Sequence, residues 1–522
     1  MRTFTRLWIC LLLLGSLGLG SCSDYFDPDQ DTILEEDKHW TSNEKVRSAM
    51  IGAYAELQDL VEEVVVLGDL RADLLTVTDN YNGDLIEIDE HRIGKNNVYA
   101  NPRVFYDVIL ACNDIIANVD KALVDADFTE EIMEVYLAEA KSLRAWTYLQ
   151  LAQTYKSVPL ILDPLTGYGE SFEPEMIERT KLLAWLVQEM EAVKDAPKLH
   201  WRGDSDDFAW DRFNINRNAL LGELHLLTGN YSTASGYFLE AIVTDGGGED
   251  SDFFKCSNRT GGSSWERIWN AVPTTETSAA YAEHVSIVPF KRTGGQSNGF
   301  AKLFLYGIAG DYLLKPTAQA ISAWEDVHDN DEDFRRERGS VGFSTIGGKL
   351  SYFVRKYVMD KDNMSLSSEI VSEAPFCIYR AADLHLMYAE AVNRMNLHDD
   401  AMATINTGIP GQPEADGIRK RINLESIDLL EYTGLKDAPH LLNKLEAVEE
   451  ILLEENAREF AFEGRRWNTL VRFASRSNNP MMLAKRVAQK FTDQAKAQEV
   501  YTELINPDNW YLDFNMNFLG KE

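Results

Sequence analysis

Apolar residues spaced three and four positions apart predict long helices in the N-terminal half of the chain. The pattern runs over residues 42–64, 104–123 and 134–155. The third segment carries two apolar stripes, one mostly of small residues and one of larger ones. A helix with two apolar faces packs against neighbours on both sides. The hydrophobic pattern therefore predicts a mainly α-helical scaffold.

Two later helical pairs share small residues at the same spacing, which indicates an internal repeat. Gly222 is followed twelve residues later by Ala234, and Ala389 is followed twelve residues later by Ala401. Helices can cross closely only where the residues at the crossing are small, and tetratricopeptide repeats use this arrangement. We therefore expect an α/α superhelical scaffold that contains tetratricopeptide units.

A loop-rich segment, 246–361, interrupts the helical pattern. Paired glycines such as those at 347–348 separate short runs of β-prone residues, among them 285–288 and 352–354. We expect an insertion subdomain with a few short strands, carried on the helical scaffold. A smaller insertion, 73–101, separates the first helix from the next.

The N-terminal segment is typical of a targeting sequence. Arg2 and Arg6 precede an apolar run, 7–19, which is short for a membrane span. The following Gly20-Ser21-Cys22 completes a sequence that resembles the lipobox of bacterial lipoproteins, in which the cysteine is acylated. The alternative is an ordinary signal peptide with a chance cysteine. We predict lipidation of Cys22, because several acyl chains anchor a protein stably.

These shifts in pattern divide the chain into five parts. The order is a signal peptide, a lipidated flexible tether, an N-terminal helical region with tetratricopeptide units, the irregular insertion and a C-terminal helical region. Their boundaries are 1–21, 22–39, 40–245, 246–361 and 362–522.

Charge excludes a nucleic-acid partner. The chain has 84 acidic and 51 basic residues and a net charge of −33. Loss of the two arginines with the signal peptide changes this to −33 − 2 = −35. Phosphate backbones need a basic face, which this composition does not supply. With 45% hydrophobic residues, the chain can nevertheless bury a large core.

Motifs for metals, cofactors and catalysis are largely missing. No His-Glu-x-x-His motif occurs, and the cysteines form no Cys-x-x-Cys pair. Residues 329–333 resemble the start of a calcium loop, but Phe334 replaces its glycine and Ser340 its final glutamate. A solvated acidic loop is the favoured interpretation. We predict a protein without a cofactor and without enzymatic activity.

The segment 454–467 is rich in Glu and Arg and invites a catalytic interpretation. Glu455 and Arg458 are neighbours on a helix, however, and Gly464 can end that helix in a left-handed turn. The spacing favours a structural network of ion pairs over an active site.

Four sequence blocks together carry a resemblance to a known family. They are 138–160, 216–220, 379–391 and 455–467, the last ending in Glu-Gly-Arg-Arg-Trp. With the lipobox, they resemble SusD/RagB-type outer-membrane lipoproteins over nearly the whole chain, in the same order. Asn468 departs from the family pattern, where an Asp is usual, and Asn456 stands where an Arg is usual.

The resemblance implies a fold and a role. Such proteins have a tetratricopeptide-containing helical scaffold with an irregular ligand-binding subdomain. They sit at the outer membrane, facing the exterior, as lids on a SusC-like TonB-dependent transporter. They capture a nutrient, usually an oligosaccharide or polysaccharide, and deliver it for import without chemistry. Two alternatives stay open: a peptide or other nutrient binder, and a surface glycoside hydrolase, which a reducing-end assay would reveal.

Candidate ligand contacts are aromatic and polar residues in the two insertions. Sugars offer flat apolar faces and hydroxyl edges, so aromatic platforms with amide or charged partners suit them. Tyr81 is the strongest candidate, because its neighbours are polar on both sides. Trp146 and Trp467 lie on helical patterns and are expected in the core. The predicted contacts are Asp73, Asn80, Tyr81, Asn82, Trp265, Tyr281, Arg292, Gln296, Asn298 and Trp324.

Overall fold

The computed structural model describes most of the chain between residues 40 and 519. Short helices and strands lie between long helices, in agreement with the mainly helical prediction. Among the residues that the structure describes, no helix has the length and apolar character that a bilayer span requires. The described residues are 40–164, 174–201, 211–246, 254–256, 268–269, 283–290, 298–304, 312–325, 335, 340–346, 349–357, 359–360, 365–366, 374–412 and 415–519.

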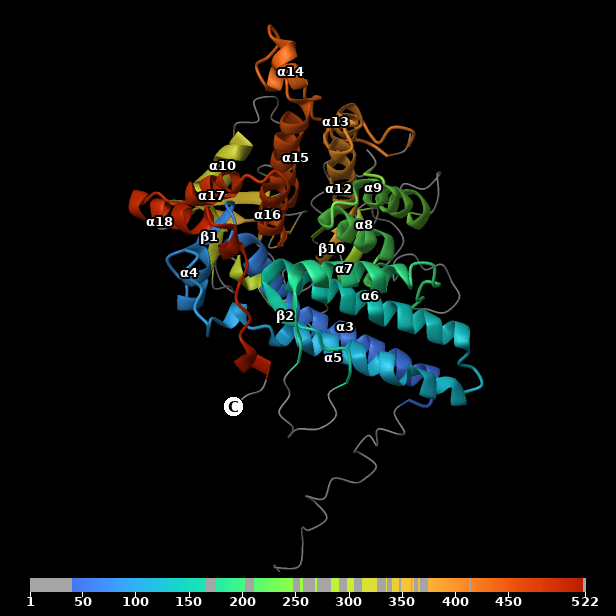
Figure 1. Cartoon of the computed structure of the whole chain (residues 1–522). Helices are drawn as coiled ribbons and strands as arrows, with labels where there is room; N and C mark the ends of the chain where they lie inside the picture. Colours follow the sequence, from blue (N-terminus) through green and yellow to red (C-terminus); the bar gives the residue numbers. More distant parts are fainter. Residues whose placement is uncertain are drawn as a thin grey trace, which may run out of the picture.

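Four helices form the N-terminal layer of the scaffold, at the lower end of Figure 1. They are α3 (Asn43–Val65), α5 (Arg103–Asn118), α6 (Glu130–Thr154) and α7 (Arg179–Glu191), and each packs against the next in space. Helix α6 is buried on both faces, as its two apolar stripes predict. Its N-cap, Thr129, accepts a hydrogen bond of 3.3 Å from the backbone N–H of Ile132.

The second predicted helix is shorter than its apolar pattern indicates. Helix α5 ends at Asn118, and the 3₁₀ helix η3 (Val119–Val124) follows. The Asn118 side chain donates hydrogen bonds of 2.8 Å to the carbonyl and the carboxylate of Asp114. Such local bonds compete with regular helix geometry, which accounts for the change at this residue.

Two helical hairpins follow, at the positions where the small-residue repeat predicts them. The first pairs α8 (Arg217–Leu227) with α9 (Tyr231–Glu240), and the second pairs α12 (Ala381–Arg394) with α13 (His398–Asn406). A Cβ atom on Gly222 would lie 2.5 Å from the Phe238 ring, so the close crossing requires glycine. The assignment of these hairpins to tetratricopeptide repeats stays a prediction.

The C-terminal part adds helices beside α12. These are α14 (Leu429–Tyr432), α15 (Lys444–Phe460), α16 (Arg466–Arg476), α17 (Pro480–Ala488) and α18 (Gln494–Leu504). Helix α15 packs against α12, α13 and α16. The short α14 lies at the upper tip of the molecule in Figure 1.

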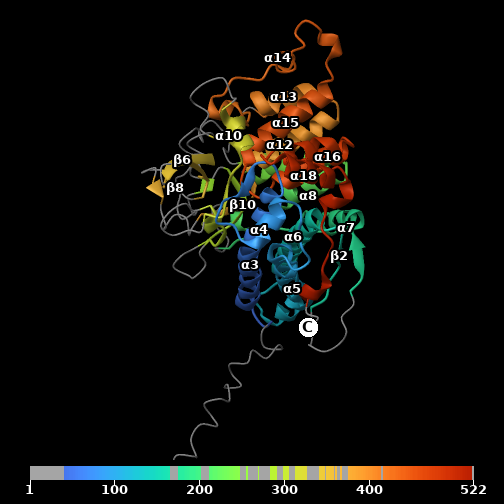
Figure 2. The same ribbon diagram turned by 90° about the vertical axis from the view of Figure 1, so that its left-hand side faces the viewer.

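The strands are short and pair antiparallel, two by two, within the described ranges. They include the predicted runs at 285–288 and 352–354. Strands β6 (Val341–Ile346) and β8 (Met359–Asp360) lie on the flank opposite α7 in Figure 2. The pairs are β1 (Leu75–Val77) with β5 (Leu314–Pro316), β2 (Ser157–Pro159) with β3 (Met176–Glu178), β4 (His284–Val288) with β10 (Phe376–Arg380), β6 (Val341–Ile346) with β7 (Lys349–Val354), and β8 (Met359–Asp360) with β9 (Ser365–Leu366).

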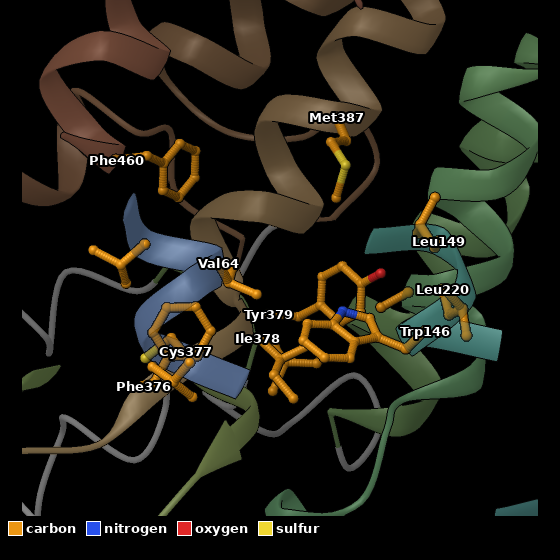
Figure 3. Packing of buried hydrophobic residues seen from close by; sticks show 14 of the residues in the cluster. Val64, Trp146, Leu149, Leu220, Phe376, Cys377, Ile378, Tyr379, Met387 and Phe460 are labelled. Atoms are coloured by element: carbon orange, nitrogen blue, oxygen red, sulfur yellow. The ribbon is translucent and has the colours of Figure 1, made fainter. Parts of the chain in front are cut away.

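Apolar side chains from distant segments meet in the interior. Figure 3 shows Trp146 from α6 close to Ile378 and Tyr379 from β10. Trp146 is 3% exposed and Trp467 is 1% exposed, which confirms both as core residues.

A buried ion network joins α15 to the rest of the protein. Glu459 accepts hydrogen bonds from Arg380 at 2.6 Å, from Arg335 at 3.3 Å and from Arg421. Burial alone raises the pKa of Glu459, but the three arginines more than reverse this, and its pKa lies well below the ordinary value. Helix α15 ends at Phe460, four residues before Gly464, so the left-handed φ of 76° at Gly464 does not end the helix as predicted. The Glu/Arg-rich segment is therefore structural, as its spacing predicts.

Candidate ligand-binding surface

The two insertions of the chain meet at a short pair of strands. Strand β1 lies in the first insertion and β5 in the second, with Leu75 opposite Pro316. The pairing continues beyond the strands, because the backbone N–H of Thr78 donates to the carbonyl of Leu313 at 2.8 Å. Strand β5 also packs beside β7. The loop after β1 is therefore held against the second insertion.

Thr78 fixes the position of the predicted contact residue Asn80. Its hydroxyl donates to the carbonyl of Tyr312 at 2.5 Å and accepts from the backbone N–H of Asn80 at 3.1 Å. The Asn80 amide lies 3.5 Å from the same Tyr312 carbonyl, a weak bond at most. Asn80 is thus placed beside an aromatic residue that is distant in sequence.

Tyr312 is itself fixed from two sides. Its backbone has a left-handed φ of 45°, a conformation that non-glycine residues rarely adopt. Its hydroxyl donates to the carbonyl of Tyr352 in β7 at 2.6 Å. Tyr352 stands opposite Phe343 of β6, and the two ring centroids are 6.3 Å apart.

These residues define an aromatic surface, which consists of Tyr81, Tyr312, Phe343 and Tyr352. Tyr81 is 48% exposed and Phe343 is 55% exposed, whereas the other two are half-buried. Leu350, near the end of the same β6–β7 hairpin, is 57% exposed. Exposed apolar area costs free energy in water, and a ligand with apolar faces would remove part of that cost. Aromatic rings beside an amide are the combination that sugar recognition uses.

Asn82 has a structural task in the same loop. Its side chain caps α4 (Gly83–Asp89), accepting from the backbone N–H of Leu85 at 2.9 Å. The cap satisfies one of the free N–H groups at the helix start. It also sets the direction in which the chain leaves Tyr81.

Asp73 is a correction to the predicted set of contacts. It is 1% exposed, and its two carboxylate oxygens each accept a hydrogen bond of 2.8 Å from the Arg466 guanidinium. Burial raises the pKa of Asp73, but Arg466 outweighs burial and the pKa is lowered. This carboxylate holds α16 to the first insertion and is not available to a ligand.

Asn298 is a second correction. It is 6% exposed, donates to the carbonyl of Ala374 at 2.7 Å and accepts from the backbone N–H of Ala301 at 3.1 Å. Its amide is occupied inside the protein, so Asn298 supports the second insertion from below the surface.

Several predicted residues lie outside the described part of the chain. Trp324 lies on α10 (Ala318–Glu325), but its side chain is not among those that the structure describes. The others are Cys22, Trp265, Tyr281, Arg292 and Gln296. Their roles stay predictions.

The aromatic surface includes residues that the sequence analysis missed, namely Tyr312, Phe343 and Tyr352. The β6–β7 hairpin had a local signal, since two β-prone runs flank a Gly-Gly pair. No local signal marked Tyr312, because its partners lie in the first insertion and in β7.

A polar cavity inside the scaffold is a weaker candidate for the ligand site. It holds about 60 Å³, and its polar groups already bind one another. Gln153 donates to Glu223 at 3.1 Å and accepts from Asn468 at 2.8 Å, and the Tyr379 hydroxyl donates to Glu223 at 2.6 Å. This network joins α6, α8, β10 and α16, and we assign it to the scaffold.

No cluster of three or more His, Cys, Asp or Glu residues that could hold a metal occurs among the described residues. The acidic stretch 329–333 lies outside them.

Comparison with known proteins gives consistent matches. Residues 291–517 match the model of the SusD family. The chain is 22% identical over 520 residues to SusD-like protein P38 of Formosa agariphila, covering 90% of this chain and 92% of that protein.

Solved structures share the fold. A SusD superfamily protein from Bacteroides vulgatus superposes with a TM-score of 0.67 at 19% identity, covering 89% of this chain and 93% of that one. Surface glycan-binding protein A from Bacteroides uniformis superposes with a TM-score of 0.64 at 19% identity, covering 87% and 93%.

Proposed function

From the premise that this chain is SusD-like in both sequence and fold, we propose that it binds a carbohydrate through the aromatic surface. The observation that carries the proposal is that hydrogen bonds from Thr78 to Tyr312 and from Tyr312 to Tyr352 tie the loop of exposed Tyr81 to the hairpin of exposed Phe343. The name of the Bacteroides uniformis relative, a surface glycan-binding protein, supports a glycan as the ligand class.

The shape of the site favours a ligand that lies across the surface. Its residues come from a loop tip and a hairpin, and Tyr81 and Phe343 keep about half of their area in water. An open surface suits a segment of an oligosaccharide or polysaccharide, whose rings can stack on successive aromatics. Binding at such a surface involves no bond cleavage, and we predict none.

The membrane role rests on the sequence. We propose that Cys22 is acylated and anchors the protein in the outer membrane, facing the exterior, and that it delivers its ligand to a SusC-like TonB-dependent transporter. Replacement of Cys22 by Ala should abolish labelling by a palmitate analogue and release the protein in soluble form. Label retained by this variant would contradict the anchor.

A glycan array of neutral, uronic and sulfated oligosaccharides tests the ligand class, and calorimetry with the strongest hit tests the site. Tyr81→Ala should weaken binding about tenfold, since a stacked ring contributes roughly 1–3 kcal/mol, by analogy with base stacking. Tyr432→Ala is the matched control, because Tyr432 is 39% exposed but lies on α14 at the other end of the molecule.

Two results would contradict the proposal. Equal affinity of wild type and Tyr81→Ala for the same glycan would remove that residue from the site. Binding to a peptide array and not to glycans would favour the peptide-binding alternative, and steady release of reducing ends would favour a hydrolase.

A further inference from the structure

A cavity at the junction of α7 and α8 concentrates positive charge in a strongly acidic protein. It holds about 90 Å³, and its lining includes four cationic residues but only two acidic ones. The whole chain has a net charge of −33, so the cavity has the opposite sign to the molecule around it. The cationic residues are Lys194, Lys198, Arg212 and Arg217.

The two carboxylates of the lining are already bound within the protein. Glu139 accepts from the hydroxyl of Tyr54 and, at 3.1 Å, from the backbone N–H of Ile215. Asp245 accepts from Lys198 at 2.7 Å and from the amides of Asn216 and Asn218 at 3.0 Å and 2.9 Å. Each of the two carboxylates therefore has at least two donors. Neither carboxylate lies within hydrogen-bond or ion-pair distance of Arg217.

Arg217 is a cation of the lining that binds backbone carbonyls and no described carboxylate. It is half-buried, and its guanidinium donates to the backbone carbonyls of Ala196 and, at 3.3 Å, of Pro197. Carbonyls orient a guanidinium without neutralising it. In the described part of the chain, Arg217 contacts no carboxylate. Lys194 also lines the cavity, paired at 3.1 Å with Glu191 on its own turn.

We propose that this cavity binds an oxyanion group, a sulfate or a carboxylate, with Arg217 as its principal ligand. A guanidinium presents several N–H donors in a plane, which suits oxyanions better than an ammonium does. The volume also fits. A cavity needs about 10–15 Å³ by this measure to hold one water, and 90 Å³ is several times that, which leaves room for a group larger than water.

The oxyanion has two possible sources, a free ion and an acidic substituent on a saccharide. Both share the chemistry that the cavity recognises. The proposal does not depend on the aromatic surface, because none of the residues of that surface lines the cavity.

Calorimetry with sodium sulfate tests the site, with ionic strength held constant by sodium chloride. The wild type should bind sulfate saturably, and Arg217→Gln should bind it about tenfold more weakly or worse, since it loses a charge-assisted bond. Lys181→Gln is the matched control. It removes the same charge from an exposed position on α7 outside the cavity, and binding should be unchanged.

A second variant, Lys194→Gln, keeps the test valid if Arg217→Gln does not fold. Circular dichroism establishes whether Arg217→Gln is folded, and Lys194→Gln, at an exposed position, should weaken sulfate binding several-fold in either case. Absence of saturable binding of both sulfate and glucuronate to the wild type would overturn the proposal. Equal affinity of wild type, Arg217→Gln and Lys194→Gln would overturn it as well.

Two further ligands identify the source. Galactose 6-sulfate that binds more tightly than sulfate, while galactose does not bind, would show a substituent-binding site. Weaker binding of galactose 6-sulfate than of sulfate would show a site for the free ion. Tyr81→Ala should leave sulfate binding unchanged, so failure at the aromatic surface and failure at this cavity are distinguishable.

Discussion

In the scaffold, Glu459 and Arg380 are fully buried and bind each other, whereas in the aromatic surface Tyr81 and Phe343 leave about half of their area in water. Charged groups thus lie inside and aromatic groups outside, against the usual preference of each. Each inversion has its own physical reason. The charges of the Glu459 network are tolerated because each has partners of opposite charge, and exposed rings would be tolerated at a surface that a ligand covers.

The largest effect on stability is expected when one buried charge is removed from the scaffold. Glu459→Gln keeps the shape of the side chain but leaves Arg380, Arg335 and Arg421 short of a buried negative partner. Loss of one member of a buried pair costs about 3–5 kcal/mol. Chemical denaturation should show this loss in the free energy of unfolding.

The control is an exposed pair of the same chemistry. Lys444 and Asp399 are 2.8 Å apart, with 46% and 87% of their side chains exposed. Asp399→Asn should cost less than about 1 kcal/mol. A Glu459→Gln variant as stable as the wild type would show that the buried network does not hold the scaffold together.

The next prediction concerns packing in the scaffold. Gly222→Ala would place a methyl group 2.5 Å from the Phe238 ring, and overpacking of this kind costs about 1–3 kcal/mol. Gly236→Ala on the facing helix α9 meets nothing within 4 Å and should stabilise by up to about 1 kcal/mol. Thermal melts of the two variants should therefore shift in opposite directions. Shifts of the same sign would contradict the close crossing of α8 and α9.

A smaller effect on stability is expected from Glu63, a largely buried carboxyl group without an opposite charge beside it. Burial raises the pKa of Glu63 from 4.5 to about 8. Its Oε2 atom is buried without a hydrogen-bond partner among the described residues. The folded protein therefore keeps a proton that the unfolded chain releases, and stability falls as pH rises from 4.5 to about 8.

Glu63→Gln should remove that fall and stabilise the protein at pH 8 by about 1–2 kcal/mol. Melting temperatures of wild type and variant between pH 5 and pH 8 provide the measurement. Glu134→Gln, at an exposed position on α6, should leave the slope unchanged. Parallel pH profiles for wild type and Glu63→Gln would refute the prediction.

The smallest effect on stability, and a large one on binding, is expected at the aromatic surface. Phe343 is 55% exposed, so Phe343→Ala should change the free energy of unfolding by less than about 0.5 kcal/mol. The same change should weaken glycan binding about tenfold. Leu441→Ala, at a residue that is 65% exposed on η13 (Pro439–Leu441), should alter neither quantity. Unchanged glycan affinity in Phe343→Ala would exclude this ring from the site.

The same contrast explains what the sequence could predict. Helix periodicity located α3 and α6 to within a few residues, and the small-residue spacing located the α8–α9 crossing, because both depend on contacts that are near in sequence. Asp73 was placed in the site because it is a polar residue of the first insertion. Its partner Arg466 lies 393 residues away, beyond the reach of local pattern.

Tyr312 was missed for the same reason. Its position depends on Thr78 and on Tyr352, and no property of the neighbouring residues signals either contact. The fold was predictable from local spacing and from the family resemblance. Which residues make up the aromatic surface depended instead on which loops meet in three dimensions.

The bond between Thr78 and Tyr312 has a consequence for the timing of folding. It joins residues that are 234 positions apart, and closing so long a loop is among the slower events in folding. A chain made from its N-terminus has Asn80 and Tyr81 in place long before Tyr312 exists. The aromatic surface is therefore completed late, after the local helices of the scaffold. A nascent or truncated chain that ends before residue 312 lacks three of the four residues of that surface, and the surface can be complete only after residue 352 has been made.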